Sequence, residues 1–236
     1  MNHKLYIVST PIGNYDDITL RALNTLKEVD FIICEEYKPT RRLLAHYGIS
    51  KELFSLNEHN ESEAASEAIL EILSGKTAAL ISDAGTPLFS DPGTILVNQA
   101  IQKKIQIIPV PGASSLLSAL VGSGFELNNF YYYGWLSPKK EIRRSQLQKL
   151  KSVNELIIIM ETPYRLQALL SDIDKTFGKN QQIVVAFKLT QNGEHFYRGT
   201  VSSIIKITSA KEKLKGEFVL LLENRKTNRG KSRSTL

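Results

Sequence analysis

The chain has 236 residues, of which 42% are hydrophobic and 23% charged, a composition typical of a globular domain. No apolar stretch approaches the roughly 20 residues that a membrane span needs. The chain enters its first predicted strand without a signal sequence, so we expect a cytoplasmic protein that does not bind a membrane. The single cysteine, Cys34, excludes an internal disulfide and a cysteine metal cluster. The four histidines show no metal-ligand spacing, so we expect no metal.

The net charge of +6 suggests an anionic partner, but it is unevenly distributed. Five cations follow one another near the end of the chain without an acidic side chain between them, and the rest of the chain carries only +1. These cations are Arg225, Lys226, Arg229, Lys231 and Arg233. A basic tail over residues 226–236 is therefore predicted to be disordered, and it could either contact phosphate or merely increase solubility.

Apolar runs and helical periodicities alternate through the first half of the chain. We expect strands at residues 5–8, 31–34, 53–56, 77–81 and 105–109. Helices are expected through Leu20, Leu23 and Leu26, through Leu43, Leu44 and Tyr47, at residues 61–73 and 95–101, and from Ser114 and Ser115 through Val121. This alternation predicts an α/β domain with a mostly parallel sheet, placed at residues 1–125.

The pattern changes after residues 122–124. We expect an aromatic strand at 130–136, a charged helix at 141–151, an apolar strand at 155–160, a helix through Leu166 and Ile173, and strands at 183–189, 195–201 and 218–223. These strands predict an antiparallel or mixed sheet in a second α/β domain, residues 126–225.

Three of the expected strands in the first domain end in loops of small and turn-forming residues, at 9–14, 82–93 and 109–115. Gly85 permits backbone angles that other residues avoid, and Asp83 follows the carboxyl end of its strand. In open α/β sheets ligands bind at that edge. Ser114 and Ser115 add hydroxyls and free backbone donors at a helix start. The loops therefore favour a ligand site, with ordinary loops as the alternative.

Together these loops resemble those of the tetrapyrrole methylase superfamily. The resemblance is carried by residues 5–14, 17–19, 81–87, 90–93 and 109–115, and more loosely by residues 134–140, 161–165, 186–190, 198–200 and 216–218. Within the superfamily the chain is most similar to the branch that methylates a ribose 2′-hydroxyl in small-subunit ribosomal RNA.

The resemblance implies a two-domain α/β methyltransferase, usually a homodimer, that holds S-adenosyl-L-methionine folded in the cleft between its domains. The cofactor contacts that it implies are Pro11, Ile12, Gly13, Asp83, Ala84, Gly85, Thr86, Ser114 and Ser115, with Ala186 and Phe218 from the second domain. Asp83 would supply a charge opposite to that of a cationic group. The family has no G-x-G-x-x-G fingerprint, so its absence here is not evidence against cofactor binding.

The acceptor side matches the RNA branch less closely than the cofactor side. That branch has an acidic pair followed by Thr-Arg-His-Thr, where this chain has Glu35 and Glu36 followed by Tyr-Lys-Pro-Thr. It has Tyr-Glu-Ser-Pro-His-Arg and Ala-Arg-Glu-Leu-Thr, where this chain reads Met-Glu-Thr-Pro-Tyr-Arg at 160–165 and Ala-Phe-Lys-Leu-Thr at 186–190. Methyl transfer is thus better indicated than the group that receives it.

A ribose hydroxyl has a pKa far above neutrality, so its methylation would benefit from a general base. Glu36 is our first candidate because it follows a strand end, and Glu35, Glu161 and Lys188 are alternatives. For each of them a helix cap or a salt bridge is the structural alternative.

Cations gather directly after the aromatic residues 131–135, an arrangement found at RNA sites, where aromatic stacking and phosphate neutralisation occur together. We therefore expect RNA contacts from Lys139, Lys140, Arg143 and Arg144, with Lys149 and Lys151 nearby. The alternatives are a solvated helix face and aromatic side chains that belong to the core. The partner expected is ribosomal RNA or the small ribosomal subunit. The competing functions are methylation of a tetrapyrrole or another small molecule, and binding of cofactor or RNA without catalysis.

Overall fold

The computed structural model describes residues 3–89, 91–210 and 214–226. The chain forms two compact units that divide between Ser115 and Leu116, whereas the sequence places the boundary near residue 125. The residues from 116 to 125 therefore pack with the second unit. No helix within the described residues is long and apolar enough to cross a membrane.

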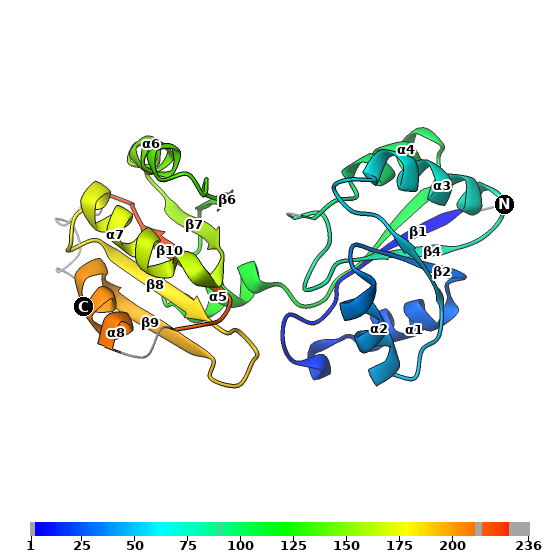
Figure 1. Ribbon diagram of the computed structural model, residues 1–236, viewed down its shortest axis with the longest axis horizontal. Helices are drawn as coiled ribbons and strands as arrows, with labels where there is room; N and C mark the ends of the chain where they lie inside the picture. The colour runs from blue at the N-terminus through cyan, green and yellow to red at the C-terminus, as the bar shows by residue number, and fades with distance from the viewer. Residues whose placement is uncertain (1–2, 90, 211–213, 227–236) are drawn as a thin grey trace, which may run out of the picture. The chain divides into compact units, whose positions relative to one another are not determined.

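The first unit is built on a parallel five-stranded sheet with the order β3-β2-β4-β1-β5. Its strands are β1 (Lys4–Val8), β2 (Phe31–Cys34), β3 (Glu52–Ser55), β4 (Ala78–Ile81) and β5 (Gln106–Val110). The helices α1 (Leu20–Glu28) and α2 (Tyr37–His46) cover one face, and α3 (Glu61–Leu73) and α4 (Thr94–Gln102) cover the other (Figure 1). A short 3₁₀ helix, η1 (Tyr15–Asp17), precedes α1.

Burial on both faces explains why the central strands of this sheet are continuous apolar runs. In β2, Phe31 and Ile33 belong to the core beneath α3 and α4, while Ile32 and Cys34 belong to the core beneath α1 and α2. All four are fully buried. The expected parallel α/β sheet is confirmed.

The second unit is built on a mixed sheet with the order β6-β7-β10-β8-β9, in which β6 and β7 are parallel and the other pairs are antiparallel. Its strands are β6 (Phe130–Trp135), β7 (Leu156–Glu161), β8 (Gln182–Phe187), β9 (His195–Thr200) and β10 (Phe218–Glu223). Its helices are α5 (Ser115–Ser123), α6 (Lys140–Leu150), α7 (Leu166–Phe177) and α8 (Val201–Ala210), with a 3₁₀ turn η2 (Pro163–Arg165) before α7. The expected mixed sheet is confirmed.

Helix α8 was not expected from the sequence. The segment is rich in β-branched residues, which favour strands. Thr200 nevertheless caps it, because its hydroxyl accepts a hydrogen bond from the Ser203 amide at 3.2 Å. Val201 and Ile204 then lie in the core of the second unit, so packing outweighs the local preference.

Helix α5 is attached to β9 through a glycine. An added Cβ at Gly122 would lie 2.2 Å from Cζ of Phe196, so any larger residue would displace the Phe196 ring. The Arg198 side chain donates to the Ser123 carbonyl at 3.2 Å and also to the Gly122 carbonyl. These contacts satisfy backbone acceptors at the end of α5.

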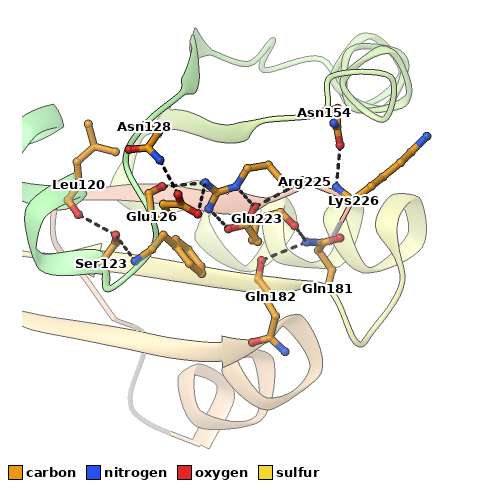
Figure 2. Close-up of polar contacts among 11 residues, drawn as sticks. Leu120, Ser123, Glu126, Asn128, Asn154, Gln181, Gln182, Glu223, Arg225 and Lys226 are labelled. Atoms are coloured by element: carbon orange, nitrogen blue, oxygen red, sulfur yellow. Dashed lines mark hydrogen bonds and ion pairs between the residues drawn. The ribbon is translucent and has the colours of Figure 1, made fainter. Parts of the chain in front are cut away.

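The end of β10 is held by a polar network, shown in Figure 2. Arg225 donates to the two carboxylate oxygens of Glu223 through Nε and Nη2, and its Nη1 donates to the Glu126 carbonyl at 3.0 Å. The backbone amide of Lys226 donates to Asn154 at 2.7 Å. The remainder of the predicted basic tail, residues 227–236, lies outside the described residues.

Two of the predicted RNA-binding arginines belong to a buried ion cluster between α6 and α7. Asp172, on α7, accepts hydrogen bonds from Arg143 at 2.7 and 2.9 Å and from Arg144 at 2.8 Å. The side chains of Arg143 and Asp172 are 6% and 3% exposed, and that of Arg144 is 40% exposed. Although burial tends to raise the pKa of the Asp172 carboxyl, these hydrogen bonds and charges lower it overall. Arg143 is thus committed to the packing of its own unit.

We predict that Asp172→Asn lowers the free energy of unfolding by about 3–5 kcal/mol, because it leaves a buried arginine without its counter-charge. Chemical denaturation measures the change. Asp174→Asn, two residues along the same helix, is the matched control and should change stability little, because Asp174 makes no ion pair with any residue that the structure describes. Equal stability of the two variants would contradict a structural role for the cluster.

Candidate active site

The structure joins two of the predicted loops at the carboxyl edge of the first sheet. Strands β1 and β4 are parallel neighbours, so their carboxyl ends emerge side by side. Just beyond them, the Thr10 amide donates to the Gly85 carbonyl at 2.8 Å, and the Gly85 amide donates to the Thr10 carbonyl at 3.1 Å. This reciprocal pair fixes the β1 loop against the β4 loop.

Hydroxyl groups connect these loops to the third one, which follows β5. The Ser9 amide donates to the Val110 carbonyl at 3.1 Å, and the Ser9 hydroxyl lies 3.0 Å from that of Thr86. Thr86 Oγ1 donates to the Ala113 carbonyl at 3.3 Å. All three small-residue loops therefore form one hydrogen-bonded structure.

Gly85 is required at the centre of this structure. Its φ of +87° lies in the left-handed region that favours glycine. A Cβ there would lie 3.2 Å from Cγ2 of Ile12, a tight contact that requires the Ile12 side chain to move by a few tenths of an ångström. The unusual backbone angles expected at this position are confirmed, and the glycine pairs through its backbone with Thr10.

The nine cofactor residues predicted in the first unit all lie on these three loops. Gly13, Asp83 and Ala84 are exposed, while Ile12, Thr86, Ser114 and Ser115 are partly buried and Pro11 and Gly85 are buried. The predicted cofactor residues therefore combine exposed residues, which a ligand can reach, with buried residues that support the loops. The two residues predicted in the second unit differ, because Ala186 and Phe218 are 0% and 4% exposed and Phe218 belongs to the core.

Carboxyl groups gather at the same edge of the sheet. The Asp83 carboxyl lies near the backbone amide of Glu36 at the end of β2, and this interaction lowers its pKa. Desolvation raises the pKa of Asp83, and the charges of Glu36 and Asp91 add to this shift. Burial also raises the pKa of Asp91 and that of Glu35, the latter with help from neighbouring acidic charges. A cation bound here would relieve an existing electrostatic cost.

Glu36 occupies the N-cap position of α2 and is exposed. Its side chain makes no capping hydrogen bond, so the helix-cap alternative does not account for it. For Glu161 the salt-bridge alternative holds, because its carboxylate is buried and pairs with Arg165 at 2.5 Å. Glu35 and Lys188 remain alternative candidates for the general base. Glu35 is only partly exposed, and neither residue lies at a helix start as Glu36 does.

The predicted RNA-contact residues on α6 divide into two groups. Lys139 and Lys140 are exposed at the start of the helix, whereas Arg143 and Arg144 are paired with Asp172. The preceding aromatic residues lie on β6, an edge strand, and only some of them follow the core alternative, since Tyr133 packs against the core of the second unit. Phe130, Tyr131 and Trp135 are about 40% exposed.

Several residues of the site were not singled out from the sequence. Thr10, Ser82 and Ser9 are buried polar residues that hold the loops together: Thr10 Oγ1 donates to the Ser82 carbonyl at 3.1 Å, and Ser82 Oγ to the Gly85 carbonyl at 3.2 Å. Asp91 was also missed, although it follows the same strand. A small hydroxyl residue directly after a buried strand was the available signal, because such a residue can satisfy loop carbonyls away from water.

Solved structures of several proteins share the fold of this chain. A solved diphthine synthase has a TM-score of 0.71 and 14% identity, with 93% of this chain and 88% of that chain covered. Cobalt precorrin-4 methyltransferase has a TM-score of 0.67 and 18% identity, with 94% and 95% covered. Uroporphyrin-III C-methyltransferase of Thermus thermophilus, solved with S-adenosyl homocysteine, has a TM-score of 0.64 and 14% identity, with 93% and 96% covered. These similarities establish the fold.

The sequence comparisons establish the family. The pattern of the Tetrapyrrole (Corrin/Porphyrin) Methylases matches residues 4–205, and the chain belongs to this family of methyltransferases. It is similar to proteins named ribosomal RNA small subunit methyltransferase I. The protein of Halalkalibacterium halodurans is 40% identical over 219 residues, which cover 93% of this chain and 75% of that protein. The Bacillus subtilis protein is 40% identical over 219 residues, with 93% and 74% covered.

We predict opposite stability changes for two carboxylates at opposite edges of the first sheet. Because the pKa of Asp83 is raised in the folded protein, its charged form costs stability above that pKa, and Asp83→Asn should raise the melting temperature at pH 7. Asp30 accepts hydrogen bonds from the Thr77 amide at 2.6 Å and the Thr77 hydroxyl at 2.9 Å, which lower its pKa, so Asp30→Asn should lower the melting temperature.

Both differences should shrink as the pH falls, because each carboxylate then becomes neutral in the parent protein. Melting curves between pH 7 and pH 3 measure this. Loss of stability in Asp83→Asn at pH 7 would show that the carboxylate is stabilising rather than held at a cost.

Proposed function

We propose that this protein transfers a methyl group from S-adenosyl-L-methionine to a ribose 2′-hydroxyl of small-subunit ribosomal RNA. The observation that carries the proposal is the joined set of loops around Gly85 in a chain that is 40% identical to proteins named for methylation of this RNA. The family relationship and the acidic loop edge support the cofactor, and the names of the relatives support the acceptor.

The three loops provide what a compact sulfonium cofactor requires. Gly13 and Ala84 are exposed residues whose backbone could bind its polar groups, and Ser114 and Ser115 add hydroxyls. Asp83 places a negative charge beside a group that is positively charged. The residues present on these loops therefore fit the cofactor.

The cofactor supplies a methyl group that is already activated, so the main task of the protein is alignment. Good positioning contributes about 7–11 kcal/mol toward lowering such a barrier. As the ribose oxygen forms its bond to the methyl carbon, the carbon–sulfur bond breaks, its electron pair stays on sulfur, and the hydroxyl proton must leave. Glu36 is the proposed acceptor of that proton because its exposed carboxylate lies at the sheet edge that carries Asp83.

The acceptor RNA would meet a basic surface. Lys139 and Lys140 are exposed and remain proposed RNA contacts, whereas the buried Arg143 is not available. We infer further that the protein works in the cytoplasm as a homodimer, as the family resemblance implies.

Transfer of labelled methyl groups tests the proposal. Incubation with labelled S-adenosylmethionine should place label in small ribosomal subunits or their RNA, at a 2′-O-methylated nucleotide, and none in a porphyrin precursor. Label in the porphyrin precursor alone would show a tetrapyrrole methylase. Tight cofactor binding without label in either acceptor would show a non-catalytic binding protein.

In the same assay we expect Glu36→Gln to lower kcat by roughly 10²–10⁴-fold, the range for loss of a general base. Affinity for the cofactor, measured by calorimetry, should change little. Glu63→Gln on the exposed surface of α3 is the matched control and should keep the full rate. A full rate in Glu36→Gln would assign the proton to another group.

A further inference from the structure

We propose that the exposed face of α2 is the surface that binds the RNA phosphate backbone. This inference rests on the proposed function and deepens it, because it assigns the acceptor to a particular face of the first unit. It differs from the basic region of α6 that the sequence indicated. The α2 face is defined by its exposed positions, which are Tyr37, Lys38, Arg41, Arg42, Ala45 and His46.

The spacing of these positions makes them one continuous surface. They form two adjacent rows, 37-41-45 and 38-42-46, in which neighbours are four residues apart and lie one above the other on a helix. The residues between them, Thr40, Leu43 and Leu44, are buried against the sheet. The whole outward side of α2 is therefore available to a partner.

The charge on this face is uncompensated. No acidic side chain occurs between residues 37 and 51. Within the described ranges, no carboxylate lies within 4 Å of the cationic nitrogens of Lys38, Arg41 or Arg42. By contrast, Arg143 and Arg144 on α6 share the buried Asp172. Three unpaired cations on one helix face are suited to a polyanion.

Arg41 is also held in place. Its guanidinium carbon lies 5.3 Å from the centre of the Tyr37 ring, within the range of a cation–π contact. The Tyr37 hydroxyl in turn accepts a hydrogen bond from the Ser55 amide at 3.2 Å, which anchors the ring at the end of β3. A stacked guanidinium keeps its edge donors free for phosphate and loses less conformational entropy on binding.

The surface adjoins the proposed chemistry at both ends. Its first residue follows Glu36, whose amide and charge both act on the pKa of Asp83. At its other end, the rings of His46 and Tyr15 lie 4.8 Å apart, and Tyr15 begins the 3₁₀ helix that follows the Pro11–Asn14 loop. An RNA strand along α2 would therefore lie beside the candidate base and the cofactor loops, with partly exposed aromatic rings that suit base stacking.

The test compares two triple variants of the full chain with equal loss of charge. The first is Lys38→Ala/Arg41→Ala/Arg42→Ala. The control, Arg21→Ala/Lys27→Ala/Lys103→Ala, removes three exposed cations from other parts of the first unit. Binding to purified small-subunit ribosomal RNA is measured across a range of salt concentrations, and calorimetry with S-adenosylmethionine together with circular dichroism reports the integrity of the fold.

We expect the α2 variant to lose affinity for RNA by roughly tenfold or more and to reduce the slope of log affinity against log salt by about 2, since each lost phosphate contact on a single strand contributes about 0.7. Cofactor affinity should be unchanged. In the transfer assay its KM for RNA should rise while kcat at saturating RNA is kept. The control should remain close to the parent protein.

Two results would overturn the inference and leave the proposed function standing: an α2 variant that binds RNA with the affinity and salt dependence of the parent, or a control that loses as much as the α2 variant. A parent protein that binds S-adenosylmethionine but neither binds nor methylates the RNA would overturn the proposed function and the inference together.

Discussion

Two backbone hydrogen bonds between Thr10 and Gly85 hold the candidate site together. They are possible because β1 and β4 are adjacent parallel strands at the centre of a sheet that is buried on both faces. Central position makes the strand ends rigid, and rigid strand ends allow small-residue loops to stay ordered without a hydrophobic core of their own. Hydroxyls of Ser9 and Thr86 then add the third loop to the pair. The cofactor residues proposed in the first unit lie on the three loops that these hydrogen bonds connect.

Acidic and basic groups of the first unit occupy separate, adjacent surfaces. Acidic groups with raised pKa values, Asp83, Asp91 and Glu35, gather at the loop edge, where their charge is costly in the absence of a cation. The basic face of α2 begins directly beside them. A sulfonium cofactor and a phosphate-rich acceptor carry opposite charges, so adjacent surfaces of opposite sign can bind both and keep each in its own place. An electrostatic cost of this kind in the unliganded protein is typical of functional sites, whose charged groups are arranged to bind a ligand rather than to stabilise the fold.

Much of the fold and of the candidate site could be predicted from the sequence, because the strongest sequence patterns lie within short segments of the chain. Continuous apolar runs followed by glycine and proline located the parallel strands and their loops, and the loops carried the family resemblance that the comparisons confirm. Helix α8 was missed because its β-branched residues favour strands and only packing against the second sheet makes them helical.

The remaining differences depended on contacts far apart in the sequence. Arg143 was grouped with the surface cations because Asp172, its partner, lies 29 residues further along the chain. The exposure of Phe130, Tyr131 and Trp135 follows from the edge position of β6, which the strand pattern alone does not reveal. The α2 face was overlooked for the complementary reason, since unpaired charge becomes visible only when the positions of all possible partners are known.

The central claim is that the loops around Gly85 hold S-adenosylmethionine, and nuclear magnetic resonance of the isotopically labelled protein tests it most directly. On titration with the cofactor, the account predicts that the largest amide shifts in the first unit occur at Ile12, Gly13, Ala84, Gly85 and Ser114, on all three loops together. Amides at the opposite edge of the sheet, such as that of Thr77, should stay unchanged. Saturable binding that shifts other amides and leaves those of the three loops in place would contradict the account.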